Sequence, residues 1–267
     1  MNLSDLLLQA VKASIKAGAE ILDVYAQPIN VEIKDDKSPL TEADKRSHQA
    51  IMAALQPLGI QIMSEEGKAI AFAERKDWEY YWLIDPLDGT KEFIKRNGEF
   101  TVNIALINKG RAIAGVIYVP VLNELFFAAE GTGAYKIENY DNASQPATLD
   151  ALKAHARKLD GNVSATAFTV VASRSHLTPE TEALINDLRT KHGTIEMVSK
   201  GSSLKLCLVA EGKANIYPRL APTMEWDTAA GQAICEQAGC TVINYHSQQP
   251  MQYNKEDLLN PWFVVSR

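Results

Sequence analysis

Short runs of apolar residues, each bounded by turn signals, constrain the fold of this chain most strongly. One run occupies residues 80–84 (YYWLI), and further runs follow at 101–107, 112–120 and 125–129. Runs of this length are typical of strands that are buried inside a sheet. The NKGR segment between the second and third runs predicts a hairpin. We therefore expect a buried sheet of antiparallel strands in the first half of the chain.

Two helices are expected before this sheet. Apolar residues recur every three or four positions from 3 to 25, which predicts an amphipathic helix that ends at Gln27-Pro28. A second helix is expected over 41–55, and short strands are expected at 31–33 and 60–63.

The second half of the chain alternates strand and helix patterns. Strands are expected at 167–172, 194–198, 214–217 and 241–243, and helices at 179–190, 202–210 and 227–238. This alternation predicts an α/β lobe. We therefore divide the chain into an N-terminal α+β lobe at 1–136 that carries most of the candidate metal ligands, a polar inter-lobe excursion at 137–162, and a C-terminal α/β lobe at 163–267.

Composition and charge narrow the class of protein. With 267 residues, of which 46% are hydrophobic, the chain can bury a core as one large or two intimate domains. A net charge of −6 argues against binding of a nucleic-acid polymer. The three cysteines form no CxxC motif, which argues against a zinc site and suits a reducing compartment. Because no signal peptide or long apolar span is visible, we expect a cytoplasmic enzyme without a transmembrane segment.

The segment DPLDGTKEF at 85–93 combines two carboxylates, a turn and a helix start, and it indicates a binding site more strongly than any other segment. Asp85 ends a buried strand, Asp88-Gly89 forms a turn, and Thr90 is expected to be the N-cap of a short helix. Two carboxylates beside free helix N–H groups suit a hard cation such as Mg²⁺ and a phosphate. A plain surface turn with an N-cap is the alternative interpretation.

Further acidic residues follow strand ends or open helices. Glu65 and Glu66 follow the strand at 60–63, and Asp227 opens a helix, where it could also be a simple N-cap. Asp44 completes a capping-box pattern with Thr41. Since Asp44 also extends the apolar face of its helix, we weigh capping alone equally against capping combined with a functional role.

Read in order, the motifs resemble those of a known family. SEE (64–66), DPLDGTKEF (85–93) and WDTAAG (226–231) resemble the lithium-sensitive, magnesium-dependent phosphomonoesterases of the inositol monophosphatase superfamily. The match narrows to the bacterial 3′(2′),5′-bisphosphate nucleotidases of sulfate assimilation through GEFTVNIAL (98–106), ASRSH (172–176), GSSLK (201–205), CLVAEG (207–212) and YPR (217–219). The resemblance covers nearly the whole chain.

The resemblance implies a fold and an activity. The fold is an α/β (α+β) layered α-β-α-β-α sandwich of two intimate lobes. The activity is Mg²⁺-dependent hydrolysis of the 3′-phosphate of 3′-phosphoadenosine 5′-phosphate, with AMP and phosphate as products, by a metal-activated water. The sulfated form of this nucleotide is a further candidate substrate. The resemblance also implies inhibition by Li⁺, and some relatives lie peripherally on the cytoplasmic face of the inner membrane.

The resemblance implies the metal ligands residue by residue. Glu65, Asp85 and the backbone carbonyl of Leu87 would hold a first Mg²⁺, and Asp85, Asp88 and Asp227 a second. Glu65 could also support a weaker third ion. The four side chains carry a charge of −4, which would repel a phosphate dianion unless two divalent cations cancelled it.

The resemblance also implies the catalytic and substrate-binding residues. Thr90, with Asp44 or Glu65, would orient and deprotonate the attacking water. The positions that match the family's substrate contacts are Glu65, Leu87, Asp88, Gly89, Thr90, His176, Ser202, Lys205, Arg219 and Asp227. Among these, Lys205 and Arg219 would hold the second phosphate. The alternatives are that Lys205 is a snorkelling surface lysine and that Arg219 is only a surface charge.

Three other functions are weighed against this one. An inositol monophosphatase-type enzyme would use the same metals with another pocket, and it would not need Lys205 and Arg219. A catalytically silent binding member is disfavoured because the four candidate acidic ligands and Thr90 are present. A calcium-binding structural module would require a regular D-x-[DN]-x-[DN]-G loop, which DPLDG does not supply. The extra acid Glu225 has either a loop role or a substrate contact.

Overall fold

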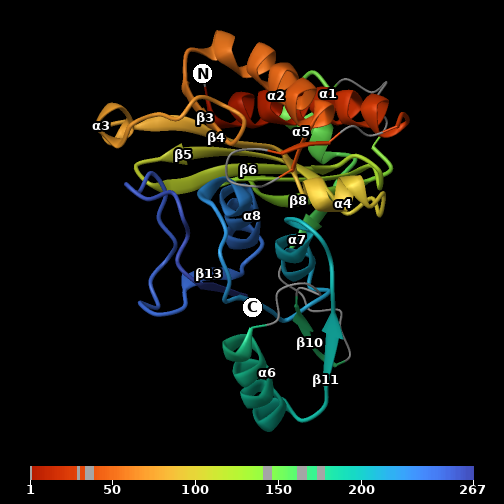
Figure 1. Ribbon diagram of the computed structural model, residues 1–267, viewed down its shortest axis with the longest axis vertical. Coiled ribbons are helices and arrows are strands. Elements are labelled where there is room, and N and C mark those ends of the chain that lie inside the picture. The colour runs from red at the N-terminus through yellow and green to blue at the C-terminus, as the bar shows by residue number, and fades with distance from the viewer. Residues whose placement is uncertain (1, 29–30, 34–38, 141–145, 161–166, 173–177) are drawn as a thin grey trace.

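The structure is a computed structural model that describes residues 2–28, 31–33, 39–140, 146–160, 167–172 and 178–267. Two sheets stack with helices outside and between them (Figure 1). From one end to the other, the layers are a helix pair, a seven-stranded sheet, a second helix pair, a five-stranded sheet and a last helix. The layered sandwich that the sequence predicts is therefore confirmed.

The first helix pair covers one face of the larger sheet. It consists of α1 (Leu3–Tyr25) and α2 (Glu42–Leu55). The Asn2 side chain caps α1 by accepting a hydrogen bond from the Asp5 backbone N–H at 2.8 Å. The apolar stripe of α1 is buried against the sheet, with Leu7, Val11 and Ile21 fully covered. Both helices were expected from the sequence, and both are confirmed.

The seven-stranded sheet separates two hydrophobic cores. In spatial order its strands are β3 (Gln61–Ser64), β4 (Tyr80–Asp88), β5 (Thr101–Asn108), β6 (Arg111–Val119), β7 (Glu124–Ala129), β8 (Gly133–Glu138) and β9 (Arg157–Leu159). Among the described strands of this sheet, β3 and β4 form the one parallel pair. Along β5, Val102 and Ile104 point into the core under α1, whereas Ala105 and Ile107 point into the other core. Burial on both faces explains why these strands read as continuous apolar runs.

The second helix pair lies between the sheets. It consists of α7 (Leu204–Ala210) and α8 (Glu225–Gln237). The five-stranded sheet contains, in spatial order, β11 (Ile195–Val198), β10 (Phe168–Val171), β12 (Ile216–Arg219), β14 (Phe263–Ser266) and β13 (Thr241–Asn244). Beyond it, α6 (Pro179–His192) packs beside β11 (Figure 1).

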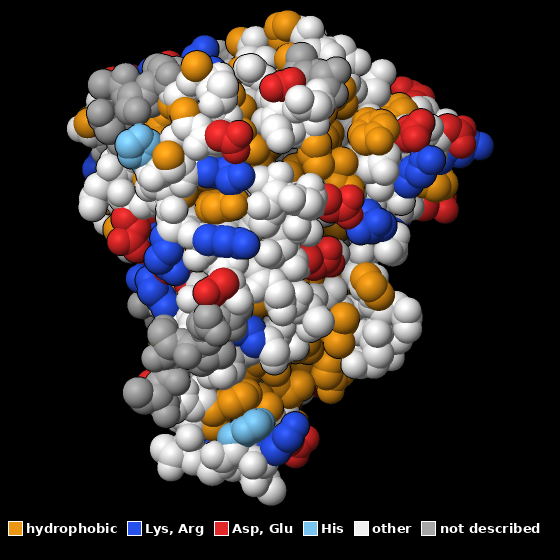
Figure 2. Space-filling model, turned by 180° about the vertical axis from the view of Figure 1, so that it is seen from behind, with side chains coloured by type: hydrophobic (Ala, Val, Ile, Leu, Met, Phe, Trp, Pro, Cys, Tyr) orange, Lys and Arg blue, Asp and Glu red, His pale blue; other side chains and the backbone are white. Residues whose placement is uncertain are grey.

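Short elements complete the chain. They are β1 (Val31–Ile33), β2 (Pro39–Thr41), η1 (Gln56–Leu58), α3 (Phe72–Arg75), α4 (Thr90–Ile94) and α5 (Leu149–Lys153). No helix in the described part of the chain has the length and hydropathy needed to span a bilayer. On the face that Figure 2 shows, basic and acidic side chains are interspersed.

Several strands were missing from the sequence-based expectation. The strand β14 inserts between β12 and β13. The apolar run at 263–265 is a short local signal for this strand, but its place in the sheet depends on pairing with residues that are distant in sequence. Inside the segment 137–162, β9 pairs with β8 and extends the larger sheet. The division of the chain into lobes stays a prediction.

Small residues allow α8 to approach the larger sheet closely. A Cβ atom at Gly115 of β6 would lie 2.3 Å from the backbone oxygen of Ala230 in α8. Since a backbone atom cannot rotate away, a side chain here would push α8 off the sheet. The first turn of α8 carries the acidic residue Asp227, so this contact also determines where Asp227 lies.

The first prediction tests this close contact. Gly115→Ala should lower the free energy of unfolding by about 3 kcal/mol, the upper range for overpacking a buried site. Gly131→Ala is the control, because a Cβ there meets nothing within 4 Å and only the positive φ of +72° opposes it. The control should lose about 1 kcal/mol. Equal denaturant midpoints for the two variants would show that α8 is free to shift.

Candidate active site

The end of β4 brings two acidic residues together through an irregularity in the strand. In a regular strand Asp85 and Asp88, three positions apart, would point to opposite faces. The pairing of β4 with β5 shifts register between these two residues. Such a bulge redirects side chains and often lies next to an active site. Both carboxylates consequently reach the same cluster, with Asp85 buried and Asp88 half-buried.

The third carboxylate comes from α8, the longer helix of the pair between the two sheets. Asp227 is the third residue of α8, and its carboxylate accepts a hydrogen bond from the Met224 backbone N–H at 2.8 Å. The alternative interpretation of Asp227 as a simple N-cap is therefore wrong, because the helix begins two residues earlier and Met224 is its N-cap. One carboxylate oxygen from each of Asp85, Asp88 and Asp227 lies within 4.8 Å of the others.

Crowding of like charges shifts the pKa values of this cluster. Burial raises the pKa of Asp85 well above its usual range, and Glu65, Asp88 and Asp227 raise it further. Burial, followed by the charge of Asp88, raises the pKa of Asp227 to about 8. Glu65 also hydrogen-bonds the Asp85 side chain. A compact set of oxygen donors whose negative charge lacks compensation suits a hard divalent cation.

Hydroxyl and amide groups fix the orientation of Asp88. The Ser202 and Ser203 hydroxyls donate to Asp88 Oδ2 at 2.6 and 2.8 Å. The Asn103 amide lies 3.4 Å from the same oxygen. Sequence analysis proposed Ser202 but missed Ser203 and Asn103, although the GSS segment and the polar position inside the apolar run 101–107 were signals for them.

Asp44 and Thr90 meet beside the cluster. Asp44 forms the expected capping box, accepting from the Thr41 backbone N–H at 2.7 Å and from its hydroxyl at 2.6 Å. The Thr90 hydroxyl donates to the other Asp44 oxygen at 3.3 Å. The sequence suggested Thr90 as the N-cap of α4, and this prediction is wrong. That position belongs to Gly89, whose φ of +93° favours glycine, so the Thr90 hydroxyl is available to Asp44.

Two adjoining cavities open at Asp88 and Asp227. The first, here called the cationic cavity, has a volume of about 480 Å³, and Ser202, Lys205 and Arg219 line it. The second, of about 490 Å³, is lined by Glu65 and Thr90. The residues that border both cavities are Asp88, Gly89, Lys91, Glu92, Thr223 and Asp227. Asp85 and Leu87 line neither cavity. The other described residues that were predicted to bind metal or substrate line one or both of them, namely Glu65, Asp88, Gly89, Thr90, Ser202, Lys205, Arg219 and Asp227.

The predicted cations differ in their surroundings. Lys205 is buried, so the interpretation of a snorkelling surface lysine is wrong. Its ammonium donates to the backbone carbonyls of Lys200 and Ser202 at 3.2 and 2.7 Å, and burial lowers its pKa to about 8. Arg219 Nη2 donates to the Pro222 carbonyl at 2.9 Å. His176 lies outside the described residues.

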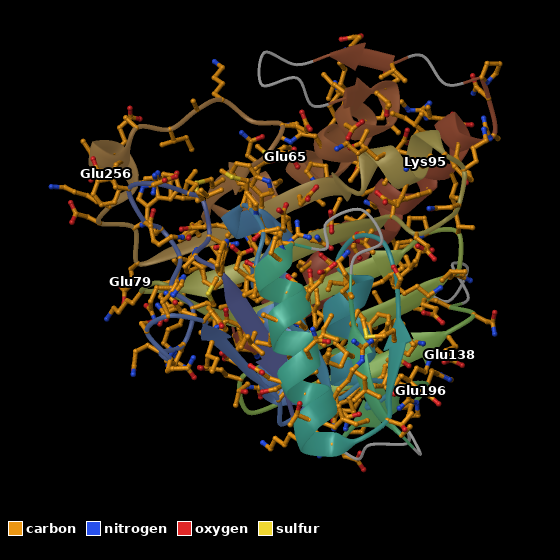
Figure 3. The ribbon with its side chains drawn as sticks, turned by 60° about the horizontal axis from the view of Figure 1, so that its bottom comes forward. Glu65, Glu79, Lys95, Glu138, Glu196 and Glu256 are labelled. Carbon is orange, nitrogen blue, oxygen red and sulfur yellow. The ribbon has the colours of Figure 1, made fainter. Side chains whose placement is uncertain are left out.

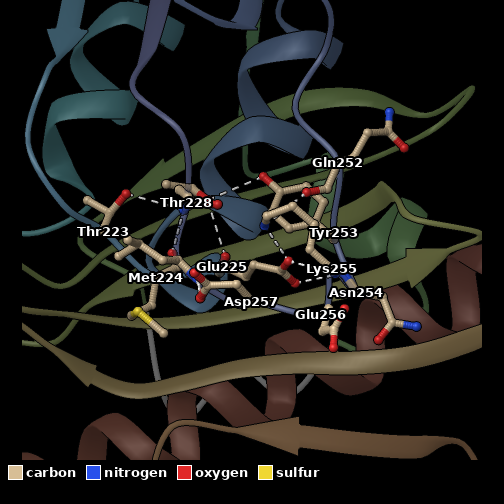
Figure 4. A network of polar contacts seen from close by, with 12 residues as sticks. Thr223, Met224, Glu225, Thr228, Gln252, Tyr253, Asn254, Lys255, Glu256 and Asp257 are labelled. Atoms are coloured by element: carbon tan, nitrogen blue, oxygen red, sulfur yellow. Dashed lines mark hydrogen bonds and ion pairs between the residues drawn. The ribbon is translucent and has the colours of Figure 1, made fainter. Parts of the chain in front are cut away.

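Glu225 is not among the residues that line the two cavities, and its carboxylate holds a loop (Figure 4). It is fully buried, and its carboxylate accepts hydrogen bonds from the backbone N–H groups of Asn254 and Lys255 at 2.7 and 3.0 Å. Arg75 of α3 binds the same loop through the Lys255 carbonyl at 2.7 Å. Of the two roles considered for Glu225, the structure supports the loop role.

The chain matches one family over almost its full length. The sequence pattern of the Inositol monophosphatase family matches residues 2–266. The chain is 44% identical over 266 residues to the 3′(2′),5′-bisphosphate nucleotidase CysQ of Escherichia coli strain K12, which covers 98% of this chain and 99% of that protein. It is 34% identical to CysQ of Haemophilus influenzae, with 97% of this chain and 92% of that protein covered.

A solved structure agrees with these sequence matches. The crystal structure of CysQ from Bacteroides thetaiotaomicron, a bacterial member of the inositol monophosphatase family, superimposes with a TM-score of 0.90. That protein is 51% identical in sequence, and the match covers 99% of this chain and 97% of the other.

The raised pKa of Asp227 yields a prediction for the metal-free protein. Its pKa rises from 3.8 to about 8 on folding, so the folded state holds the proton more tightly than the unfolded chain. This carboxyl therefore destabilises the fold increasingly as pH rises from about 4 to about 8. With a chelator present, Asp227→Asn should be more stable than wild type at pH 8 by about 1 kcal/mol or more, and the difference should shrink toward pH 4.

The measurement is chemical denaturation of both proteins between pH 4 and 8. Asp150→Asn serves as the control, because the Asp150 side chain is 91% exposed. A difference between wild type and Asp227→Asn that did not change with pH would contradict the proposed charge crowding.

Proposed function

This chain belongs to the inositol monophosphatase family, and from that premise we propose that it is a metal-dependent 3′(2′),5′-bisphosphate nucleotidase. The observation that carries the proposal is the cluster of Asp85, Asp88 and Asp227 beside a cavity lined by cations. Full-length similarity to curated bisphosphate nucleotidases supports the same reaction. The proposed substrate is 3′-phosphoadenosine 5′-phosphate, which would yield AMP and phosphate.

The family is metal-dependent, and the acidic cluster fits a metal. The proposed ion is Mg²⁺, in two sites: Glu65, Asp85 and the Leu87 carbonyl at one, and Asp85, Asp88 and Asp227 at the other. When bound, Mg²⁺ supplies positive charge that stabilises the phosphate and makes water more acidic.

The chain's own residues have three tasks in this reaction. Ser202 and Ser203 hold Asp88 in one orientation. Asp44, already fixed by the capping box, orients the Thr90 hydroxyl, and this pair is proposed to position the attacking water and accept its proton. The Gly89 and Thr90 N–H groups are proposed to face the scissile phosphate. Positioning and charge stabilisation suffice for phosphoryl transfer, so no nucleophilic side chain is required.

The most damaging single change should be Asp85→Asn, because Asp85 is proposed to contact both ions. Phosphate release from 3′-phosphoadenosine 5′-phosphate at saturating Mg²⁺ should fall about 10³-fold or more, as when a key electrostatic group is lost. The fold should survive, since an asparagine relieves like-charge crowding. Asp150→Asn should retain wild-type turnover. A tenth of wild-type activity remaining in Asp85→Asn would contradict the shared-ligand arrangement.

Substrate specificity should depend on Arg219. Arg219→Ala should raise KM for 3′-phosphoadenosine 5′-phosphate roughly 10- to 100-fold, the effect of losing one charged hydrogen-bonded contact. Hydrolysis of a monophosphate should change far less, because only the bisphosphate presents a second dianion. Steady-state kinetics with both substrates provides the comparison. Equal losses would assign Arg219 to the scissile phosphate or to the fold.

A further inference from the structure

Five basic side chains line the cationic cavity, and among the residues that the structure describes, Lys91 and Lys95 are the two whose charged groups have no protein partner. Lys200 pairs with Glu99 at 3.2 Å. The two cations proposed from the sequence, Lys205 and Arg219, donate to backbone carbonyls. In the described part of the chain, the side chains of Lys91 and Lys95 form no hydrogen bond or ion pair.

Lys91 lies in α4, and Lys95 is the C-cap of this helix. Because Lys95 keeps right-handed helical backbone angles (φ −74°, ψ −4°), its position four residues after Lys91 places the two on the same side of the helix. Between them, Phe93 is buried, and its ring packs 5.2 Å from the rings of both Tyr25 and Phe100. This aromatic anchor holds α4 in place, so the lysines border the cavity from a rigid element. Figure 3 labels Lys95, which follows α4, and Glu65, which precedes β4.

The position of α4 relates the lysines to the reacting group. The helix begins at Thr90, directly after the strand that carries Asp85 and Asp88. Lys91 borders both cavities, whereas Lys95 borders only the cationic one. The charges of Lys91 and Lys95 are therefore distributed from the boundary near the acidic cluster into the cationic cavity. A second anionic group of a substrate bound at the cluster could reach them there.

Two buried polar atoms indicate that the same cavity receives a polar ligand. Arg219 Nε and Ser199 Oγ are buried and have no hydrogen-bond partner among the described residues. Both residues line the cationic cavity. Because buried polar atoms are rarely left unpaired, an anionic group with several acceptor oxygens is a suitable occupant.

We propose that Lys91 and Lys95 are specificity-determining residues that bind the second, non-reacting phosphate of a bisphosphate nucleotide. This inference rests on the proposed function, which supplies the substrate class. An ammonium is a mobile point charge on a flexible stem, so the pair can follow a dianion without a fixed bidentate geometry. Since both lysines are exposed, salt should weaken their contribution.

The test compares two substrates that differ only in the 5′-phosphate, namely 3′-phosphoadenosine 5′-phosphate and adenosine 3′-monophosphate. Lys91→Met and Lys95→Met keep the side-chain length and remove the charge. Each should raise KM for the bisphosphate about 3- to 10-fold, an effect between that of an exposed ion pair and that of a full charged hydrogen bond. The double variant should raise it about 10- to 100-fold. The corresponding rise for the monophosphate should be at least threefold smaller, and Lys→Arg variants should restore most of the loss.

Lys109→Met is the matched control, because Lys109 is 72% exposed and pairs with Glu79 away from both cavities. It should change neither KM. An unchanged KM for the bisphosphate in the double variant would overturn the proposal. An equal rise with both substrates would also overturn it, because the lysines would then act on the scissile phosphate. A wild-type enzyme that failed to hydrolyse the bisphosphate would contradict the proposed function instead.

Discussion

Repulsion among the carboxylates of Asp85, Asp88 and Asp227 is the constraint that the packing around the site must overcome. Three acidic groups within 4.8 Å cannot all be ionised without compensating charge. The fold nevertheless brings them together from the end of β4 and the first turn of α8. Such a cluster persists only because tightly packed elements on both sides hold it, and a bound cation would convert this repulsion into attraction.

Many contacts share the task of holding Asp227 in the cluster. Close packing at Gly115 sets the distance of α8 from the sheet. At the start of α8, the Glu225 carboxylate accepts a hydrogen bond from the Lys255 backbone N–H, and the Arg75 guanidinium donates one to the Lys255 carbonyl. These two contacts fix the loop around Lys255. The Asn260 amide donates to the Met224 carbonyl at 2.6 Å, which fixes the residue that caps the helix. The acidic centre therefore has a rigid support, which is what electrostatic catalysis requires.

The sequence predicted those features that are encoded locally. The buried strands and the two N-terminal helices follow from apolar runs and periodicity. The acidic motifs indicated the carboxylates of the site, and the layered fold followed from the family resemblance of the motifs. The bulge that turns Asp85 and Asp88 to one side could not be predicted, because it depends on pairing with β5. The same holds for Lys205, whose inward turn toward the Lys200 carbonyl reverses the interpretation of a surface residue. Strand β14 has a short local signal in its apolar run at 263–265, but its position between β12 and β13 depends on long-range pairing that the sequence does not show locally. The assigned ligand and substrate roles remain predictions from the resemblance.

The central claim is that this acidic cluster, loaded with Mg²⁺, hydrolyses a bisphosphate nucleotide. The most direct measurement is phosphate release from 3′-phosphoadenosine 5′-phosphate, AMP, inositol 1-phosphate and fructose 1,6-bisphosphate, each with and without Mg²⁺. The account predicts that the bisphosphate nucleotide is hydrolysed with the highest kcat/KM and only when Mg²⁺ is present. A preference for inositol 1-phosphate, or hydrolysis that persists after complete removal of divalent cations, would contradict it.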